Sequence, residues 1–365
     1  MKIRCNQEDF SSAINIVSKA VAVRSTLTIA ECILITAFGD EIKLTANNNE
    51  LGIETIMDGT IEEEGMIAVD AKIFSEFIKS FPSDQIIMTT DEKYAINLKC
   101  GSSNLDLTGR SGDDFAFLPE IEHQNAVEIP QMALKDIIRQ TIFSTADSES
   151  NAVMRGEQFL IEGNILQMTS VDGHRFSIRR IGLNDDYGSK SAIVPAKTLN
   201  ELSKILRDDM NEFVQIVFSN NNMLFLFDTT TVVTRLIEGE FLDINRMMMA
   251  DYETKFSVSK KLMTETLRRA ALLSREGDKK PIIMNVNDDV LHIELKTHVG
   301  SLNEDIVISK EGKNLKIGFN PSFLLDVFNV VDDENVDIYM GSSRYPCYIK
   351  DEAKTYNYMV LPVNI

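Results

Sequence analysis

A chain of 365 residues is too long for one ordinary hydrophobic core, and a third of that length, about 120 residues, is close to the usual domain size. With 44% hydrophobic and 25% charged residues, and no apolar run long enough to cross a bilayer, the composition excludes a membrane-spanning protein. The formal net charge of −19 excludes a protein that binds nucleic acid over its whole surface, because its long-range field repels phosphate. Contact with nucleic acid would require a local basic stripe.

The first third of the chain contains two predicted helices among short strands. The first helix, over 7–21, places Phe10, Ala13 and Ile14 at helical spacing, and the second lies within 65–81. Residues alternate in character in six further runs, which predict strands: 32–37, 41–46, 52–56, 85–89, 94–100 and 104–108.

The second and third parts of the chain repeat this order. A helix is predicted over 131–143 in the second part and over 260–273 in the third. The stretch 65–81 returns at 192–206 and at 315–331, with a constant spacing: 196 − 71 = 125 and 321 − 196 = 125. The chain is therefore a threefold repeat, and we expect domains at 1–122, 126–248 and 254–365.

The repeated helix has an apolar side and a charged side. The apolar positions, which we expect to be buried, are Phe74/Leu199/Leu324, Phe77/Leu202/Val327 and Phe81/Leu206/Val331. On the other side Lys72 matches Lys197, and Lys79 matches Lys204. Repeated lysines indicate a face that meets an anion, although an internal duplication that has changed little would preserve them too.

These elements predict an α+β protein with antiparallel sheets on the outside and paired helices on one side. The segments between the repeats, 119–125 and 248–254, are short and poor in glycine and serine. Flexible linkers have the opposite composition, so we expect the three domains to keep a fixed mutual orientation.

Cysteines and histidines give no sign of a metal or cofactor site. Cys5, Cys32, Cys100 and Cys347 are scattered without C-x-x-C pairing, and we expect reduced core or surface residues. The four histidines lack metal-ligand spacing. The N-terminal residues carry no apolar signal segment, so we expect a cytoplasmic protein.

Two local features allow alternative interpretations. Asp172 and His174 could act as acid and base in a hydrolase, but no serine or cysteine nucleophile motif accompanies them, and Asp-Gly also favours a tight turn. The apolar tail over 358–365 predicts either a last buried strand or the lining of an apolar groove. Methionines at 247–249 are typical of core filler or of adaptable peptide-binding surfaces.

Several of these features together resemble the bacterial DNA sliding clamps, the beta subunits of DNA polymerase III. The resemblance covers all 365 residues and rests on the threefold repeat and on the segments 169–176, 239–243, 318–320 and 361–363. It implies the DNA-clamp fold, with two three-domain subunits forming a closed ring whose helices line the hole. It also implies a non-enzymatic processivity factor that encircles double-stranded DNA without sequence specificity and slides along it.

The resemblance assigns the inner basic residues of this ring. They would contact the phosphate backbone without reading bases. The third repeated helix differs, with Ser322 and Asn329 where the other copies have lysine. The implied DNA-binding residues are Arg24, Lys72, Lys79, Lys197, Lys204, Arg207, Arg275, Lys279 and Lys280.

The resemblance also implies a peptide-binding pocket between the second and third domains. It would take short linear motifs of the replicative polymerase catalytic subunit, the clamp loader, other polymerases and repair proteins. Val171, Leu242 and Asn364 depart from the residues common in the family. The implied lining is Met154, Val171, Gly173, His174, Arg175, Phe176, Leu242, Arg246, Met247, Asn320, Phe323, Met359, Val360, Leu361, Pro362 and Val363.

For ring closure, the resemblance places Leu105 and Leu107 of one subunit against Leu272 and Leu273 of the other. Two other classes of function remain open at this stage. One is a monomeric three-repeat scaffold that does not bind DNA, with lysines that are merely solvated. The other is a hydrolase that uses Asp172 and His174.

Overall fold

A computed structural model describes residues 1–119, 125–147, 151–244, 251–276 and 280–365. The contacts divide the chain into two compact units, residues 1–133 with 200–236, and residues 134–199 with 237–365. The division passes through the second predicted domain. Both predicted boundaries fall partly on undescribed residues, 120–124 and 245–250, so they stay a prediction.

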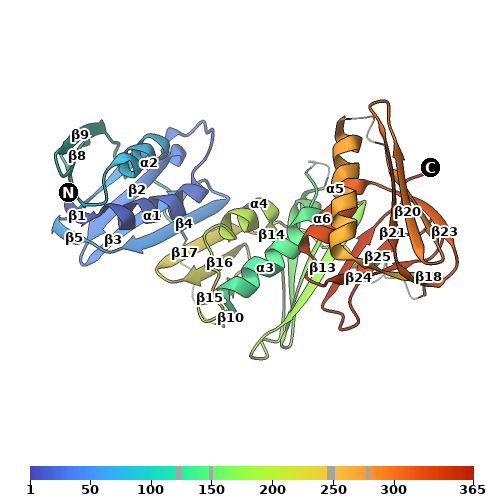
Figure 1. Ribbon diagram of the computed structural model, residues 1–365. Coiled ribbons are helices and arrows are strands. Elements are labelled where there is room, and N and C mark those ends of the chain that lie inside the picture. The colour runs from blue at the N-terminus through green and yellow to red at the C-terminus, as the bar shows by residue number, and fades with distance from the viewer. Residues whose placement is uncertain (120–124, 148–150, 245–250, 277–279) are drawn as a thin grey trace. The chain divides into compact units, whose positions relative to one another are not determined.

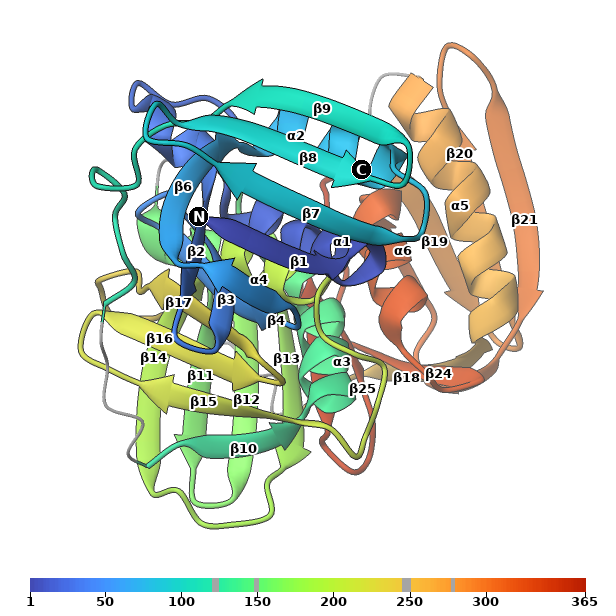
Figure 2. The ribbon, with the colours of Figure 1, turned by 90° about the vertical axis from the view of Figure 1, so that its left-hand side faces the viewer.

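The first unit contains two antiparallel sheets in its described part. Figure 2 shows the strands of the first sheet in front, with α1 and α2 behind them. Its order is β5-β1-β7-β8-β9, with β1 Lys2–Asn6, β5 Thr60–Glu63, β7 Gln85–Thr90, β8 Ala95–Cys100 and β9 Ser103–Thr108. β9 pairs with β8 on one side only within the described residues, so it is an edge strand.

The second sheet of this unit joins strands from two repeats. β4 pairs antiparallel with β17, bringing Thr55 opposite Thr230, whose hydroxyl oxygens lie 2.9 Å apart. Its order is β10-β15-β16-β17-β4-β3-β2-β6, with β10 Val127–Pro130, β15 Phe213–Phe218, β16 Asn222–Phe227, β17 Thr230–Arg235, β4 Leu51–Met57, β3 Glu41–Asn47, β2 Cys32–Phe38 and β6 Gly65–Asp70.

Helices α1 (Gln7–Val17) and α2 (Ala71–Ser80) pack against each other through Phe10 and Phe74, whose ring centroids are 5.4 Å apart. The Asp70 carboxylate accepts a hydrogen bond from the Ile73 amide and so fixes the start of α2. Two predicted core positions differ: Phe77 is 37% exposed and Phe81 is half-buried, whereas Ile78 is buried.

In the second unit a nine-stranded sheet again joins two repeats within the described residues (Figure 1). Here β13 pairs antiparallel with β26, with Phe176 opposite Met359. The order is β14-β11-β12-β13-β26-β25-β24-β18-β22, with β14 Ser189–Pro195, β11 Gly156–Glu162, β12 Ile165–Val171, β13 Arg175–Gly182, β26 Tyr356–Val360, β25 Cys347–Lys350, β24 Asn335–Met340, β18 Thr254–Ser259 and β22 Ser309–Gly312.

A smaller sheet, β21-β20-β19-β23, covers the core of the third repeat. Its strands are β19 Ile282–Asn287, β20 Val290–Lys296, β21 Ser301–Val307 and β23 Leu315–Phe319. Among the described residues β21 pairs only with β20, so it is a second edge strand. Helices α5 (Lys260–Glu276) and α6 (Pro321–Val330) lie side by side over this core.

Helix α3 (Gln131–Thr141) begins where predicted. Helix α4 (Ala196–Leu202) lies within the predicted stretch 192–206 but is shorter than its counterparts. After Leu202 the chain continues in turns, with the Ile205 amide bonded to the Leu202 carbonyl. Leu206 is still buried, as predicted, although it lies beyond the helix. Lys204 therefore stands on a turn rather than on a helical face.

The four cysteines are buried and free, in agreement with the prediction of reduced core residues. Burial, reinforced by the nearby Asp9 carboxylate, raises the pKa of the Cys5 thiol to about 12. A thiol with such a pKa is protonated at neutral pH and unreactive. No helix within the described ranges is long and apolar enough to cross a membrane.

Glu157 of β11 is a carboxylic acid in an apolar core. Its side chain is fully buried, and burial raises its pKa to about 8, although the hydrogen bond with Thr141 acts in the opposite direction. The Thr141 hydroxyl lies 2.7 Å from Glu157 Oε2 and 2.8 Å from the Ile137 carbonyl oxygen, and it has one proton for two acceptors. A protonated Glu157 that donates to Thr141 satisfies both contacts.

Replacing Glu157 by Gln is expected to remove a pH dependence of stability. The unfolded carboxyl ionises near pH 4.5 and the folded one near pH 8, so wild-type stability falls as pH rises through this window. The loss amounts to about 1.4 kcal/mol for each unit of pKa difference, and a few kcal/mol in all. Urea unfolding at pH 5, 6, 7 and 8 measures it. A constant difference between the two proteins across this range would contradict the assignment.

Candidate functional sites

The turn that joins β12 to β13 is held by Asp172. Its Oδ1 accepts hydrogen bonds from the amides of His174 (2.8 Å) and Arg175 (3.0 Å), and Gly173 adopts the positive φ of 88° that the turn requires. Its Oδ2 accepts from the Arg175 guanidinium at 2.9 Å. With both carboxylate oxygens committed to the turn, Asp172 orients no base, and the His174 ring stacks on Phe323 instead.

Arg175 links the second and third repeats inside the second unit. Besides Asp172, its guanidinium donates to Asp326 of α6 at 2.6 Å and to the Phe143 carbonyl at 2.5 Å. It also lies over the Phe323 ring, 4.4 Å from the centroid. Because two carboxylates neutralise it and its side chain is only 10% exposed, Arg175 positions its neighbours rather than offering a free charge.

An apolar cluster forms where β13 and β26 meet, and we call it the C-terminal apolar cluster. It contains five residues of the predicted pocket lining: Met154, Val171, Phe176, Met359 and Leu361. It also contains residues that sequence analysis missed, namely Ile178, Phe241, Ile244, Tyr339 and Tyr348. Side chains alternate along β24 and β25, so Tyr339 and Tyr348 lie on the same face of the sheet as this cluster. Only the long-range pairing of β13 with β26 shows that this face extends from the second repeat into the third.

The C-terminal tail runs along this cluster. The Leu361 amide donates to the His174 carbonyl and the Val363 amide to the Gly318 carbonyl, both at 2.8 Å. Successive residues of β26 face opposite sides, so Val360 packs into the core of the third repeat while Met359 joins the C-terminal apolar cluster. The tail thus forms a last buried strand over β26, which is the first of the two predicted alternatives, and an apolar groove lined by the tail stays a prediction.

The other predicted pocket residues lie around this cluster. His174, Leu242 and Val363 are exposed, whereas Pro362 and Phe323 are half-buried. Asn320 caps α6, its side-chain oxygen accepting a hydrogen bond from the Ser322 amide at 3.0 Å. Arg246 and Met247 lie outside the described residues.

The predicted DNA-binding residues that the structure describes are all exposed. Arg24, Lys72, Lys79 and Lys197 form no ion pair within the described ranges, so their charges are available. Lys204 and Arg207 are instead paired with Glu201 (2.6 Å) and Asp228 (3.0 Å). Lys280 and Arg275 flank the undescribed 277–279, which include Lys279.

The leucines predicted for ring closure occupy two separate places. Leu105 and Leu107 are half-buried on the edge strand β9. Leu272 of α5 is 52% exposed, but Leu273 packs against the core of the third repeat. Leu272 is therefore the one of this pair that a second subunit could cover.

Family models match the chain in three consecutive segments. The N-terminal, central and C-terminal domain models of the DNA polymerase III beta subunit match residues 1–119, 128–243 and 245–364. The chain belongs to this family of bacterial sliding clamps. The beta sliding clamp of Halalkalibacterium halodurans is 33% identical over 355 residues, covering 93% of each chain, and that of Staphylococcus epidermidis is 30% identical over 376 residues, covering 100% and 99%.

Solved clamp structures have the same fold. A putative DNA polymerase III beta subunit from Eubacterium rectale aligns over 100% of both chains with a TM-score of 0.97 and 47% identity. The sliding clamp of Bacillus subtilis aligns over 100% of this chain and 99% of its own, with a TM-score of 0.96 and 29% identity.

These matches confirm the predicted fold class of three clamp domains built from antiparallel sheets with a few helices. The family consists of non-catalytic processivity factors of DNA replication, so the hydrolase alternative is wrong. Its physical basis fails as well, because Asp172 holds a turn and an arginine instead of activating His174.

Proposed function

We propose that two copies of this chain form a closed ring around duplex DNA, slide along it without reading sequence, and tether polymerases and repair proteins. We thus propose three things: ring formation, encirclement of DNA and a peptide-binding site. Three features of the described residues support them. The cytoplasmic location predicted from the sequence belongs to the same proposal, since this is where bacterial replication takes place.

Unpaired strand edges are the main support for the proposed ring. By position in the repeat, β4, β13 and β21 are equivalent, and so are β17, β26 and β9. β4 pairs with β17 and β13 pairs with β26, each joining one repeat to the next. The remaining equivalents, β21 and β9, are edges within the described part of the chain. An edge strand is a template for another chain, so β21 of each subunit would pair with β9 of the other.

Two such seams close the ring. Because β21 and β9 are different surfaces, a single contact is heterologous, and a second copy with the same contact completes a two-subunit ring. Leu105 and Leu107 share one face of β9, and the exposed Leu272 would supply an apolar partner on α5. A monomeric scaffold would leave both edges and these leucines in water.

The basic residues suit weak contact with a phosphate backbone. Lys72 and Lys197 occupy the same position of the repeated helix, and both are exposed and free of ion pairs within the described ranges. The rest of the molecule carries enough acid to give a net charge of −19. Such a protein gains affinity only where the lysines face DNA, and durable attachment then comes from ring closure rather than from contact strength.

The C-terminal apolar cluster suits short linear peptides. Half-buried Leu361 and Pro362 and exposed Leu242 and Val363 give its rim an apolar surface, while His174 adds a polar group. Leucine or phenylalanine side chains of a peptide could bury themselves there. The proposed partners are the replicative polymerase catalytic subunit, the clamp loader, other polymerases and repair proteins.

The experiment that tests this function loads the protein onto nicked circular DNA and onto linear DNA of the same sequence, and compares how long it stays. The retention time depends on whether the DNA has free ends only if the protein is a closed ring around it.

A further inference from the structure

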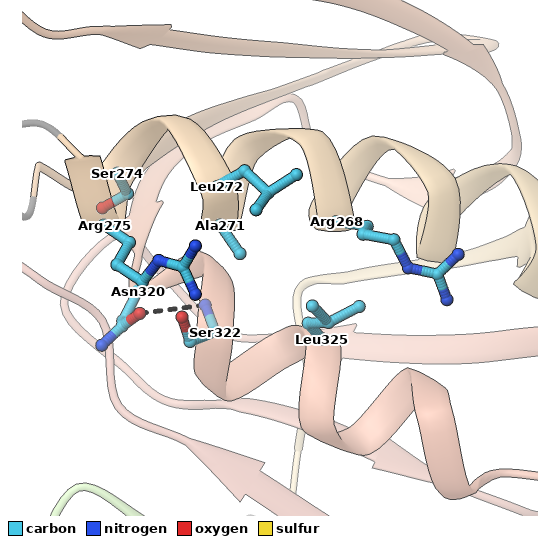
Figure 3. A pocket seen from close by; sticks show the side chains of 8 residues that line it. All are labelled: Arg268, Ala271, Leu272, Ser274, Arg275, Asn320, Ser322 and Leu325. Atoms are coloured by element: carbon cyan, nitrogen blue, oxygen red, sulfur yellow. Dashed lines mark hydrogen bonds between the residues drawn. The ribbon is translucent and has the colours of Figure 1, made fainter.

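A cavity of about 460 Å³ lies in the groove between α5 and α6 (Figure 3). Arg275, which borders it, already belongs to the proposed DNA contact, so we assign this cavity no function of its own. A different cavity, of about 290 Å³, lies in the first unit, where β4 of the first repeat pairs with β17 of the second. None of the residues that line it belongs to the proposed DNA, peptide or ring contacts.

This second cavity has the same place in the repeat as the proposed peptide site has one repeat later. Gly52 of β4 and Val233 of β17 lie opposite each other in the sheet, and both line the cavity. Phe176 of β13 and Met359 of β26 lie opposite each other in the same way, and both belong to the C-terminal apolar cluster. The two sites are therefore built on equivalent strand pairs.

The backbone around the two sites is equivalent as well. The Arg235 amide donates to the Glu50 carbonyl at 2.9 Å, as the Leu361 amide donates to the His174 carbonyl at 2.8 Å. The Asn48 side chain holds the turn between β3 and β4 by accepting from the Glu50 amide at 3.0 Å, and a side-chain oxygen holds the turn between β12 and β13 in the same manner. The frame that suits an extended peptide between the second and third repeats thus recurs between the first and second.

The side chains on this frame differ in character. A Cβ at residue 52 would meet a methyl group of Leu118, so that side chain occupies the space beside Gly52. Arg235 stands at the position of Leu361, and Glu50 stands at the position of a histidine. The cavity between the first two repeats therefore offers charged and polar groups where the later site is apolar.

The polar groups of this cavity are uncommitted within the described part of the chain. Arg235 and Glu50 are exposed, and neither side chain forms a hydrogen bond or ion pair with a described residue. The same holds for the side-chain amides of Asn49, Asn221 and Asn222, which also line the cavity. A carboxamide has a carbonyl acceptor and N–H donors, and a peptide unit has the complementary pair.

We propose that this cavity, which we call the polar peptide site, binds an extended segment of a partner protein that presents an Asp or Glu side chain to Arg235. The guanidinium offers a planar fork of donors that matches a carboxylate. The three carboxamides would bond the main chain of the segment, and Glu50 would accept one of its N–H groups. The volume of about 290 Å³ is at the lower end of the roughly 300–1,000 Å³ typical of ligand pockets, so only a short part of the segment enters.

The comparison of the two sites rests on the proposed function, but the expected ligands differ. The proposed peptide site takes leucine or phenylalanine anchors, whereas the polar peptide site has no open apolar space for them beside Gly52. A partner with one motif of each kind would be held at two places on the same subunit.

The test begins with a phage-displayed library of random heptapeptides. The library is depleted on Arg235→Glu protein and then selected on the wild type, which removes ligands of the proposed peptide site because that site is the same in both proteins. The enriched peptides are expected to contain Asp or Glu. A synthetic, fluorescein-labelled copy of the most enriched peptide then serves as the probe for fluorescence anisotropy.

Arg235→Gln is expected to weaken binding of this probe at least about tenfold, because a hydrogen bond between two charged groups is lost. Asn221→Ala is expected to weaken it a few-fold. Lys93→Gln is the matched control, since it removes one positive charge from an exposed side chain of the same unit outside the cavity. Its affinity should equal that of the wild type. All three residues are exposed, so the variants should melt at the wild-type temperature.

A selection that enriches no acidic peptide, or equal affinity of Arg235→Gln and the wild type, would overturn the inference. An equal loss in Lys93→Gln would overturn it too, because the effect would then be one of net charge. Failure of the proposed peptide site is recognised separately: Leu361→Asp would then leave the binding of a leucine and phenylalanine peptide unchanged, whereas the acidic probe would still depend on Arg235.

Discussion

Replacing Leu107 and Leu272 by Asp in the same chain is expected to convert the proposed dimer into monomers of 41.1 kDa. In the ring each of the two seams would bury one carboxylate from β9 and one from α5. Burying an unpaired charge costs several kcal/mol, and two like charges at one seam repel each other as well. Sedimentation equilibrium at micromolar concentration measures the mass, which should be twice 41.1 kDa for the wild type.

The design uses Leu272 rather than Leu273, because Leu273 packs into the core of the third repeat and its loss would destabilise the monomer. Ile165→Asp with Phe213→Asp is the control: both side chains are more than 40% exposed, and both belong to the second repeat, which takes no part in the proposed seam. A Leu107/Leu272 variant that still sediments as a dimer would exclude this seam. A monomeric wild type would favour the scaffold alternative.

Leu361→Asp is expected to weaken peptide binding at least about tenfold, corresponding to about 1.4 kcal/mol. Leu361 is half-buried against the C-terminal apolar cluster, and a carboxylate there would face any apolar anchor. The probe is a labelled peptide of about ten residues with leucine and phenylalanine, taken from the replicative polymerase of the same organism. Fluorescence anisotropy gives the dissociation constant, and the dimer mass should not change.

Ile165→Asp serves as the matched substitution here. Ile165 begins β12 and Val171 ends it, so this exposed side chain lies roughly 20 Å along the strand from Val171 of the cluster. Unchanged affinity in Leu361→Asp, or the same loss in both variants, would place the peptide elsewhere.

Local features of the fold were predictable from the sequence. Helix starts at residues 7, 131 and 260 follow from apolar spacing, and the strands follow from alternation, because both signals lie within a few residues of the chain. The threefold repeat predicts that the chain has three domains. Helix ends were less accurate: α1 stops at Val17, where the Ser18 hydroxyl bonds the Ile14 carbonyl, rather than at residue 21.

Long-range features were not predictable in the same way. No local pattern indicates that β13 pairs with β26, and without that pairing Tyr339 and Tyr348 cannot be assigned to the same cluster as Val171. The role of Arg175 depends on Asp326, which lies 151 residues away. The resemblance to the clamp family predicted that Arg175 lines the pocket. Only the contacts of Arg175 in the structure indicate that it positions its neighbours.

The central claim is that attachment to DNA depends on topology. The most direct measurement compares the dissociation half-time of loaded, labelled protein from nicked circular DNA with that from linear DNA of the same length. A closed ring predicts retention on the circle for many times longer than on the linear molecule, and blocking both linear ends with bound protein should restore the long half-time. Equal half-times on all three substrates would contradict the encircling ring.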